Sequence, residues 1–134
     1  MRRLVMLCAV AILLMGVPCS GQTEQLRITS PKDGAGVPHM PAITVTAPAE
    51  AKQVWLVVYP KGTGQYWVQP VVRQIRKGEW RGQVYIGRAG TIDVGKAFEI
   101  LAVGNPADDL REGDQLTSWP EAPLRSQIIE VIRK

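Results

Sequence analysis

The sequence is poor in cysteine, which cross-links small domains through disulfide bonds, and in histidine, which with cysteine binds transition metals. It has two cysteines, Cys8 and Cys19, and a single histidine, His39. If an N-terminal leader is removed, at most Cys19 remains, so no intramolecular disulfide can form. A zinc site would need several Cys or His ligands, and a thiol enzyme would need a Cys paired with a His. We therefore expect a domain that is held by packing alone, with no metal and no cofactor.

The chain also lacks a strong net charge. Its formal charge of +4 falls to +2 when residues 1–21 are set aside, because that stretch holds Arg2 and Arg3 and no acidic residue. Nucleic-acid-binding domains concentrate basic residues in a patch or stripe, so we expect no nucleic acid among the partners. The length of 134 residues, with 46% hydrophobic and 21% charged residues, suits a single globular domain.

The N-terminus has the three-part pattern of a signal peptide. Arg2 and Arg3 form a charged start, residues 4–15 form an apolar run of 12 residues, and small or turn-forming residues follow as far as Gly21. A retained transmembrane helix would need roughly 20 apolar residues. We therefore expect residues 1–21 to be a cleaved signal peptide, and the product to be periplasmic or extracellular with no stable membrane span.

Cys19 leaves a second possibility for the N-terminus. A cysteine just after an apolar leader can be the lipidated first residue of a bacterial lipoprotein. Pro18 stands immediately before it, where a lipobox has a small residue, and the fixed ring of proline makes that peptide bond a poor substrate. Cleavage beyond Cys19 is therefore favoured, and residues 22–134 are expected to form one domain.

Helical patterns are missing from residues 22–134, where no stretch of ten or more residues shows helical periodicity. The chain has short strand-like runs instead. Residues 54–59 (VWLVVY) and Ala97–Gly104 (AFEILAVG) are almost continuously apolar, as expected of strands buried on both faces. The remaining strand-like runs alternate or carry a mixed pattern, and they cover residues 25–30, 43–47, 65–70, 80–86 and 126–133.

These runs predict an all-β fold, a two-sheet sandwich of about seven strands. A small closed β-barrel is the alternative architecture. We expect residues 54–59 to lie in the middle of one sheet beside Ala97–Gly104, with Trp55 as a large core side chain. Residues 65–70 are expected at an edge or in an irregular crossing, because Pro70 has no N–H to donate to a ladder.

The domain resembles the bacterial immunoglobulin-like domains of exported proteins. The resemblance rests on an opener (ITSPKDG), a following ITVT strand, the VWLVV strand, the GEWRG segment and the closing apolar strand, found at residues 28–34, 43–46, 54–58, 78–82 and 126–133. It implies an immunoglobulin-like sandwich with Trp55 in the place of the strand-C tryptophan, and a role in adhesion, binding or spacing. It implies no catalytic residue.

The sequence holds no convincing catalytic or metal-binding pattern. His39 lies in a loop between Pro38 and Met40 without the nucleophile and carboxylate that a catalytic histidine needs. The acidic loop at residues 108–114 could offer oxygen ligands to calcium, but it lacks the EF-hand pattern and contains the opposing Arg111. We therefore expect no enzyme activity. A small envelope enzyme or enzyme inhibitor using His39 or the acidic loop is the alternative.

The aromatic residues after the first apolar strand are the best candidates for a binding site. Tyr66 and Trp67 follow a glycine-rich turn and stand between Gln65 and Gln69. Aromatic faces beside amides can bind sugars or extended peptides, and an edge strand can accept a partner strand. The alternative is that Trp67 belongs to the core, because most tryptophans in a small β-domain do.

A basic neighbourhood follows the aromatic pair. Its members are Arg73, Arg76, Lys77, Arg81 and Arg88. If the flanking segments form a hairpin around residues 77–79, several of these side chains could share one face and attract anionic glycans or lipid headgroups. The alternative is that they keep an exposed strand soluble and protect its edge.

Together these features predict an exported, non-enzymatic module that binds a protein or cell-envelope component. The predicted site residues are Gln65, Tyr66, Trp67, Gln69, Arg73 and Arg81. A structural or accessory subunit without a small ligand is a further alternative.

Overall fold

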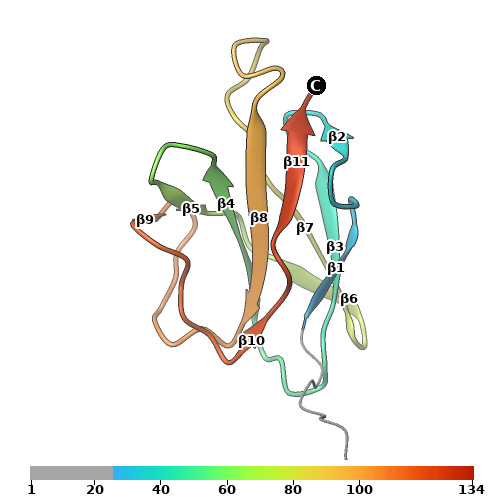
Figure 1. The fold of residues 1–134 in the computed structure, drawn as a ribbon. Coiled ribbons are helices and arrows are strands. Elements are labelled where there is room, and N and C mark those ends of the chain that lie inside the picture. Colours follow the sequence, from blue (N-terminus) through green and yellow to red (C-terminus); the bar gives the residue numbers. More distant parts are fainter. Residues whose placement is uncertain (1–25) are drawn as a thin grey trace, which may run out of the picture.

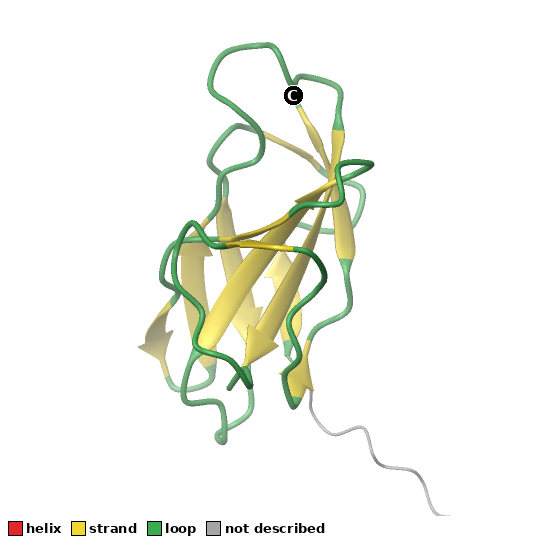
Figure 2. Ribbon diagram, turned by 90° about the vertical axis from the view of Figure 1, so that its left-hand side faces the viewer, coloured by secondary structure: helices red, strands yellow, loops and turns green. Residues whose placement is uncertain are grey.

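The computed structural model describes residues 26–134, which form eleven β-strands joined by turns and loops, with no helix among them (Figure 2). The all-β prediction is therefore confirmed. Nothing in this segment forms an apolar helix of membrane-spanning length. The predicted signal peptide (1–21) and Cys19 lie outside the described residues.

The strands form two sheets. The smaller sheet has four strands in the order β1 (Arg27–Ser30), β3 (Ala42–Thr46), β7 (Glu79–Gln83) and β6 (Arg73–Arg76). The larger has seven, in the order β2 (Gly36–Val37), β11 (Ile129–Arg133), β8 (Ala97–Gly104), β4 (Val54–Pro60), β5 (Tyr66–Val68) and β9 (Gln115–Leu116), with β10 (Leu124–Arg125) also paired to β8. Figure 1 shows β8 between β4 and β11. Both sheets end in open edges, so the fold is a two-sheet sandwich and the barrel alternative is wrong.

The two apolar runs are neighbours at the centre of the larger sheet. β4 and β8 are antiparallel and paired along the whole of β4, from Val54 opposite Gly104 to Pro60 opposite Phe98. One face of β4 contributes Leu56 to the core between the sheets, and the other contributes Val57 to a second apolar cluster. The prediction that β4 is buried on both faces is therefore confirmed.

The tryptophan of the inter-sheet core is Trp80, not Trp55. Trp80 on β7 is 7% exposed and packs among core residues from both sheets, such as Ile43 and Leu56. Trp55 is half-buried and packs on the second cluster, outside the sandwich. Side chains alternate along a strand, so the inward position of Leu56 forces Trp55 outward. The expectation that Trp55 anchors the inter-sheet core is wrong.

The long connection between β8 and β10 covers the outer face of the larger sheet. Its Leu110, Leu116 and Trp119 pack on side chains from β4, β5 and β8. Within this connection, β9 pairs with β5, placing Leu116 opposite Tyr66. β5 is therefore not an edge strand, and the prediction of an edge at residues 65–70 is wrong. The covering explains why the central strands are apolar on both faces.

The chain leaves the smaller sheet after β7 but keeps its alternation. The hairpin between β6 and β7 turns at Lys77 and Gly78, as predicted. Beyond β7, Val84 and Ile86 stay fully buried. Their backbone N–H groups donate to the carbonyls of Pro41 (3.2 Å) and His39 (2.8 Å). The following segment contributes Tyr85, Gly87 and Arg88 to the lining of a cleft at the end of the sandwich that carries β5.

Candidate functional site

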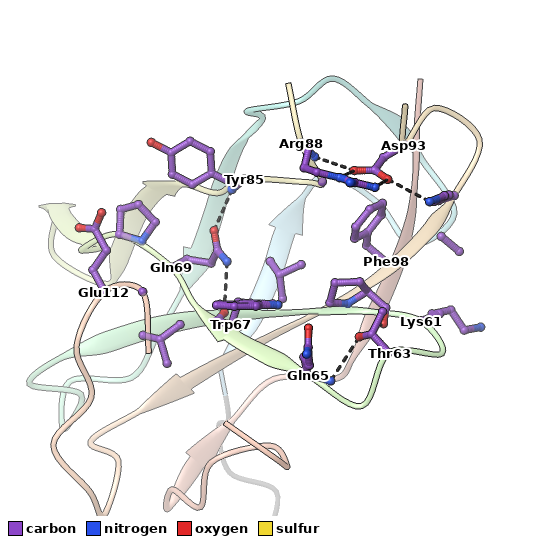
Figure 3. Close-up of a pocket in the computed structure, with 18 residues that line it drawn as sticks. Lys61, Thr63, Gln65, Trp67, Gln69, Tyr85, Arg88, Asp93, Phe98 and Glu112 are labelled. Carbon is purple, nitrogen blue, oxygen red and sulfur yellow. Dashed lines mark hydrogen bonds and ion pairs between the residues drawn. The ribbon is translucent and has the colours of Figure 1, made fainter. Parts of the chain in front are cut away.

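A cleft of about 780 Å³ opens at this end of the sandwich (Figure 3). One wall comes from the end of β4, the turn that follows it, and β5; the other comes from residues 85–88 and 93–98. The lining mixes apolar and polar groups, among them Val58, Trp67, Phe98, Gln65, Arg88 and Asp93. Concave sites of this size with a few fixed polar groups are typical of ligand-binding sites.

Strand alternation separates the two predicted aromatic residues. Trp67 lies opposite Val58 of β4 and lines the cleft. Tyr66 points to the other face of the sheet, where its ring stacks on Tyr59 at 4.4 Å between centroids and meets Trp119 edge-on at 4.8 Å. The prediction that Tyr66 and Trp67 form one surface is therefore wrong, because neighbours on a strand point to opposite faces.

Gln69 lines the cleft but its amide is already occupied. The residue is 4% exposed. Its Nε2 donates to the carbonyl of Trp67 (3.1 Å), and its Oε1 accepts the backbone N–H of Tyr85 (2.8 Å). The side chain thus ties β5 to the opposite wall (Figure 3). Gln69 holds the cleft in shape and positions Trp67, since both ends of its amide have partners within the protein.

The turn after β4 presents Gln65 at the edge of the cleft. The Thr63 hydroxyl donates to the carbonyl of Pro60 (2.7 Å) and accepts the backbone N–H of Gln65 (3.2 Å). Gln65 is exposed, and its side-chain amide makes no hydrogen bond within residues 26–134. A fixed turn therefore holds a free amide beside the Trp67 indole.

The opposite wall is built around a buried carboxylate. Asp93, 5% exposed, accepts the Arg88 backbone N–H (2.7 Å) and the Nε (3.1 Å) and Nη2 (3.0 Å) of the same guanidinium, and pairs with Lys96 Nζ at 3.0 Å. The Arg88 guanidinium, its backbone N–H and the Lys96 ammonium hold the pKa of the Asp93 carboxyl far below its usual value, against the effect of burial. Asp93 is therefore an anion that fixes the planar Arg88 group at the rim (Figure 3).

Gly87 allows the carboxylate to approach the chain so closely. Its φ is +82°, and a Cβ there would stand 2.9 Å from both Cβ and Oδ2 of Asp93. Only glycine combines a positive φ with this much free space.

Arg133 secures the loop that carries this wall. The guanidinium is buried, and its Nη1 donates to the carbonyls of Ile86 (2.9 Å) and Arg88 (2.8 Å), while Nη2 donates to that of Gly90 (2.6 Å). The backbone of Arg133 also bonds to Gly95 and Lys96 at the far end of the loop. Strand β11 thereby holds both ends of residues 86–96.

The structure brings together three of the predicted site residues and separates the others. Gln65, Trp67 and Gln69 line the cleft. Arg73 and Arg81 lie on the four-stranded sheet and are not part of the cleft lining. Arg88, predicted as one of the basic group, joins the cleft instead. Asp93, Lys96 and Phe98 were not predicted as site residues. They lie far from β5 in the sequence, so no local pattern indicates that they meet it in the cleft.

Both features considered for catalysis adjoin the cleft: Glu112 of the acidic loop is in its lining, and so is Tyr85, the residue beside His39. His39 lies against Tyr85, with 5.7 Å between ring centroids. In the acidic loop, the Asp114 carboxylate accepts the backbone N–H of Arg111 (3.0 Å) and closes its own turn. No group of three or more His, Cys, Asp or Glu side chains within residues 26–134 is placed to hold a metal ion.

No protein-family model matches this chain, and no curated protein matches its sequence.

Proposed function

We propose that this chain is an exported, non-enzymatic immunoglobulin-like module that binds a protein or cell-envelope component in the cleft beside Trp67. The observation that carries the proposal is the position of the Trp67 indole. It lines an open cleft beside Val58, its partner on β4, whose side chain belongs to the core between the sheets. A large aromatic side chain left half-buried between polar groups is a typical contact for sugars and peptide segments.

The surrounding groups support binding in a defined orientation. Gln65 offers a free amide on one side of Trp67, and Arg88 presents a fixed guanidinium on the other wall. Gln69 links the two walls, so little ordering is needed when a ligand enters. Because β9 occupies the outer side of β5, the ligand would be held by side chains rather than by addition of a strand.

A matched pair of substitutions on β5 tests the proposal. Residues 22–134 are immobilised and incubated with envelope extract, with Trp67→Ala and Tyr66→Ala in parallel. Both changes remove an aromatic ring from the same strand, but only Trp67 lines the cleft. We expect Trp67→Ala to lose the captured component and Tyr66→Ala to keep it, with circular dichroism showing that both variants fold.

Two results would refute the proposal. Capture by Trp67→Ala at the level of the unaltered chain would show that the cleft is not the site. Loss of capture from Gln65→Ala, Trp67→Ala and Tyr66→Ala alike, with all three folded, would show that the contact involves both faces of β5 and is not confined to the cleft. Gln65 is exposed, so its substitution should change stability by less than about 0.5 kcal/mol.

A further inference from the structure

The outward face of the four-stranded sheet carries a cluster of charged and hydroxyl side chains. Pairing places Arg73 on β6 directly opposite Arg81 on β7, which in turn lies opposite Thr44 on β3. The neighbouring row runs from Arg27 through Thr46 and Glu79 to Arg76. Directly paired residues share a face. We call the four arginines of these rows, Arg27, Arg73, Arg76 and Arg81, the arginine face.

This face is turned away from the core. Ile43, Val45 and Trp80, the alternating residues on β3 and β7, are buried between the sheets. Arg73 and Arg81 are therefore on the outside, and both are exposed. Of the predicted basic group, Arg73, Arg76 and Arg81 thus share a face, joined by Arg27. Lys77 lies in the hairpin turn and Arg88 in the cleft lining.

The charges on the arginine face are poorly compensated. Arg76 pairs with Glu79 at 3.0 Å. Arg27, Arg73 and Arg81 form no ion pair with any other residue in 26–134. Like charges directly opposite each other on neighbouring strands are destabilising, so the Arg73–Arg81 pair costs stability.

Edge protection explains only part of this arrangement. β6 is an edge strand, and charged residues on an edge discourage pairing with another chain. An irregularity in register between Gln74 and Arg76 already interrupts that edge. Arg81 lies on β7, which is paired on both sides, so it has no edge to protect.

We propose that the arginine face binds a carboxylate-bearing polysaccharide, lying across the four strands. The planar guanidinium matches a carboxylate in a bidentate pair, and a bound carboxylate would relieve the repulsion between Arg73 and Arg81. The arginines extend from β1 to β6, three strand spacings or about 14 Å, which suits a polymer with repeated carboxylates better than one small anion. Thr44 and Thr46 stand between them with hydroxyls that can bond to sugar hydroxyls.

Other polyanions fit this face less well. No aromatic side chain stands among the outward positions of β3 and β7, whereas single-stranded nucleic acids are bound by stacking on such groups. The same positions hold no large apolar side chain, and β6 adds the exposed Ile75 alone, whereas a helix lying in a membrane interface buries a whole apolar face. The site is separate from the cleft beside Trp67 and does not depend on the function proposed for it.

Binding to polygalacturonate, measured by titration calorimetry with residues 22–134, tests this inference. The double variant Arg73→Gln/Arg81→Gln removes two charges from the face. The matched control Arg111→Gln/Arg125→Gln removes two exposed arginines that lie elsewhere on the chain. Each charged hydrogen bond lost should weaken binding by about tenfold. We therefore expect a loss of about a hundredfold for the first variant, from its two arginines, and near-unchanged affinity for the second.

Ligand controls identify the source of the negative charge. Fully methyl-esterified polygalacturonate, which has the same backbone without carboxylates, should not bind. The inference is overturned if the unaltered chain fails to bind polygalacturonate, if both double variants lose affinity equally, or if the ester binds as well as the acid. Tighter binding to vesicles of phosphatidylglycerol than to polygalacturonate would also overturn it, in favour of a membrane surface.

Discussion

Substitution of the buried Arg133 tests whether its guanidinium stabilises the cleft wall formed by residues 86–96. Arg133 is 4% exposed and donates to three carbonyl oxygens, those of Ile86, Arg88 and Gly90. Its Nε is buried without a partner in residues 26–134. The change Arg133→Met keeps an unbranched apolar stem and removes all three hydrogen bonds.

The expected cost follows from where the three carbonyls lie. Ile86 is fully buried, and a buried carbonyl left unpaired costs about 1–3 kcal/mol. Arg88 and Gly90 are exposed, so water can replace the lost donors and each contributes about 0.5–1.5 kcal/mol. Arg133→Met also removes a buried charge and the unpartnered Nε, and this gain offsets part of the loss in stability. We expect a net loss of about 2–4 kcal/mol in the free energy of unfolding.

Urea denaturation of residues 22–134 measures this loss. With a slope of about 1–2 kcal/mol per molar for a domain of this size, the midpoint should fall by at least about 1 M. Arg133→Lys retains the charge but cannot reproduce the fork of donors, so it should also be destabilised. Arg125→Met, at an exposed arginine on β10, is the control and should change stability by less than about 0.5 kcal/mol. A loss below about 1 kcal/mol for Arg133→Met, or unchanged stability for Arg133→Lys, would refute the reasoning.

Two more predictions concern the core and the cleft wall. Trp80→Ala should lower the free energy of unfolding by about 3–5 kcal/mol, because Trp80 is buried between the sheets. Trp55→Ala should lower it by about 1–2 kcal/mol, because that side chain is half-buried on the outer cluster. Chemical denaturation measures both losses, and a larger loss for Trp55→Ala would contradict the assignment of Trp80 to the core. The pKa of Asp93 is lowered in the folded protein, so its contribution to stability is present above its unfolded pKa of about 3.9 and is lost as the pH falls toward the folded value. The difference in urea midpoint between the unaltered chain and Asp93→Asn should therefore stay constant from about pH 7 to 5 and narrow below about pH 4; a difference that stays constant into strong acid would contradict the ion pairs with Arg88 and Lys96.

Local patterns were sufficient to predict the longer strands of the larger sheet, but not the two-residue strands β2, β9 and β10. The continuous apolar run of β4 correctly indicated burial on both faces, and β8 correctly appeared as its neighbour. The run predicted at residues 80–86 alternates in sequence, and its Trp80, Val84 and Ile86 are buried between the sheets. These predictions succeed because a strand has a period of two, so each side chain's face is fixed by its neighbours in sequence.

The errors concern relations between segments far apart in the chain. β5 was predicted at an edge, but β9 covers it. Trp55 and Trp80 are both compatible with a core from their local sequence, and only the packing of the two sheets decides that Trp80 is inside. Likewise, Tyr66 was grouped with Trp67, although the alternation that succeeded elsewhere already separates them.

The sequence by itself determined an all-β chain and the burial of the central strands of its larger sheet on both faces, because these depend on short-range periodicity. Tertiary structure alone decided the two surfaces that are proposed to bind. The cleft needs β5, the turn at residues 61–65 and the loop at 86–96 to meet, and the Gln69 amide and Arg133 guanidinium that hold them act over long sequence separations. The arginine face likewise exists only once the register of β6, β7, β3 and β1 is set. Such placements depend on the packing of the two sheets and on hydrogen bonds between distant residues, which no local pattern encodes.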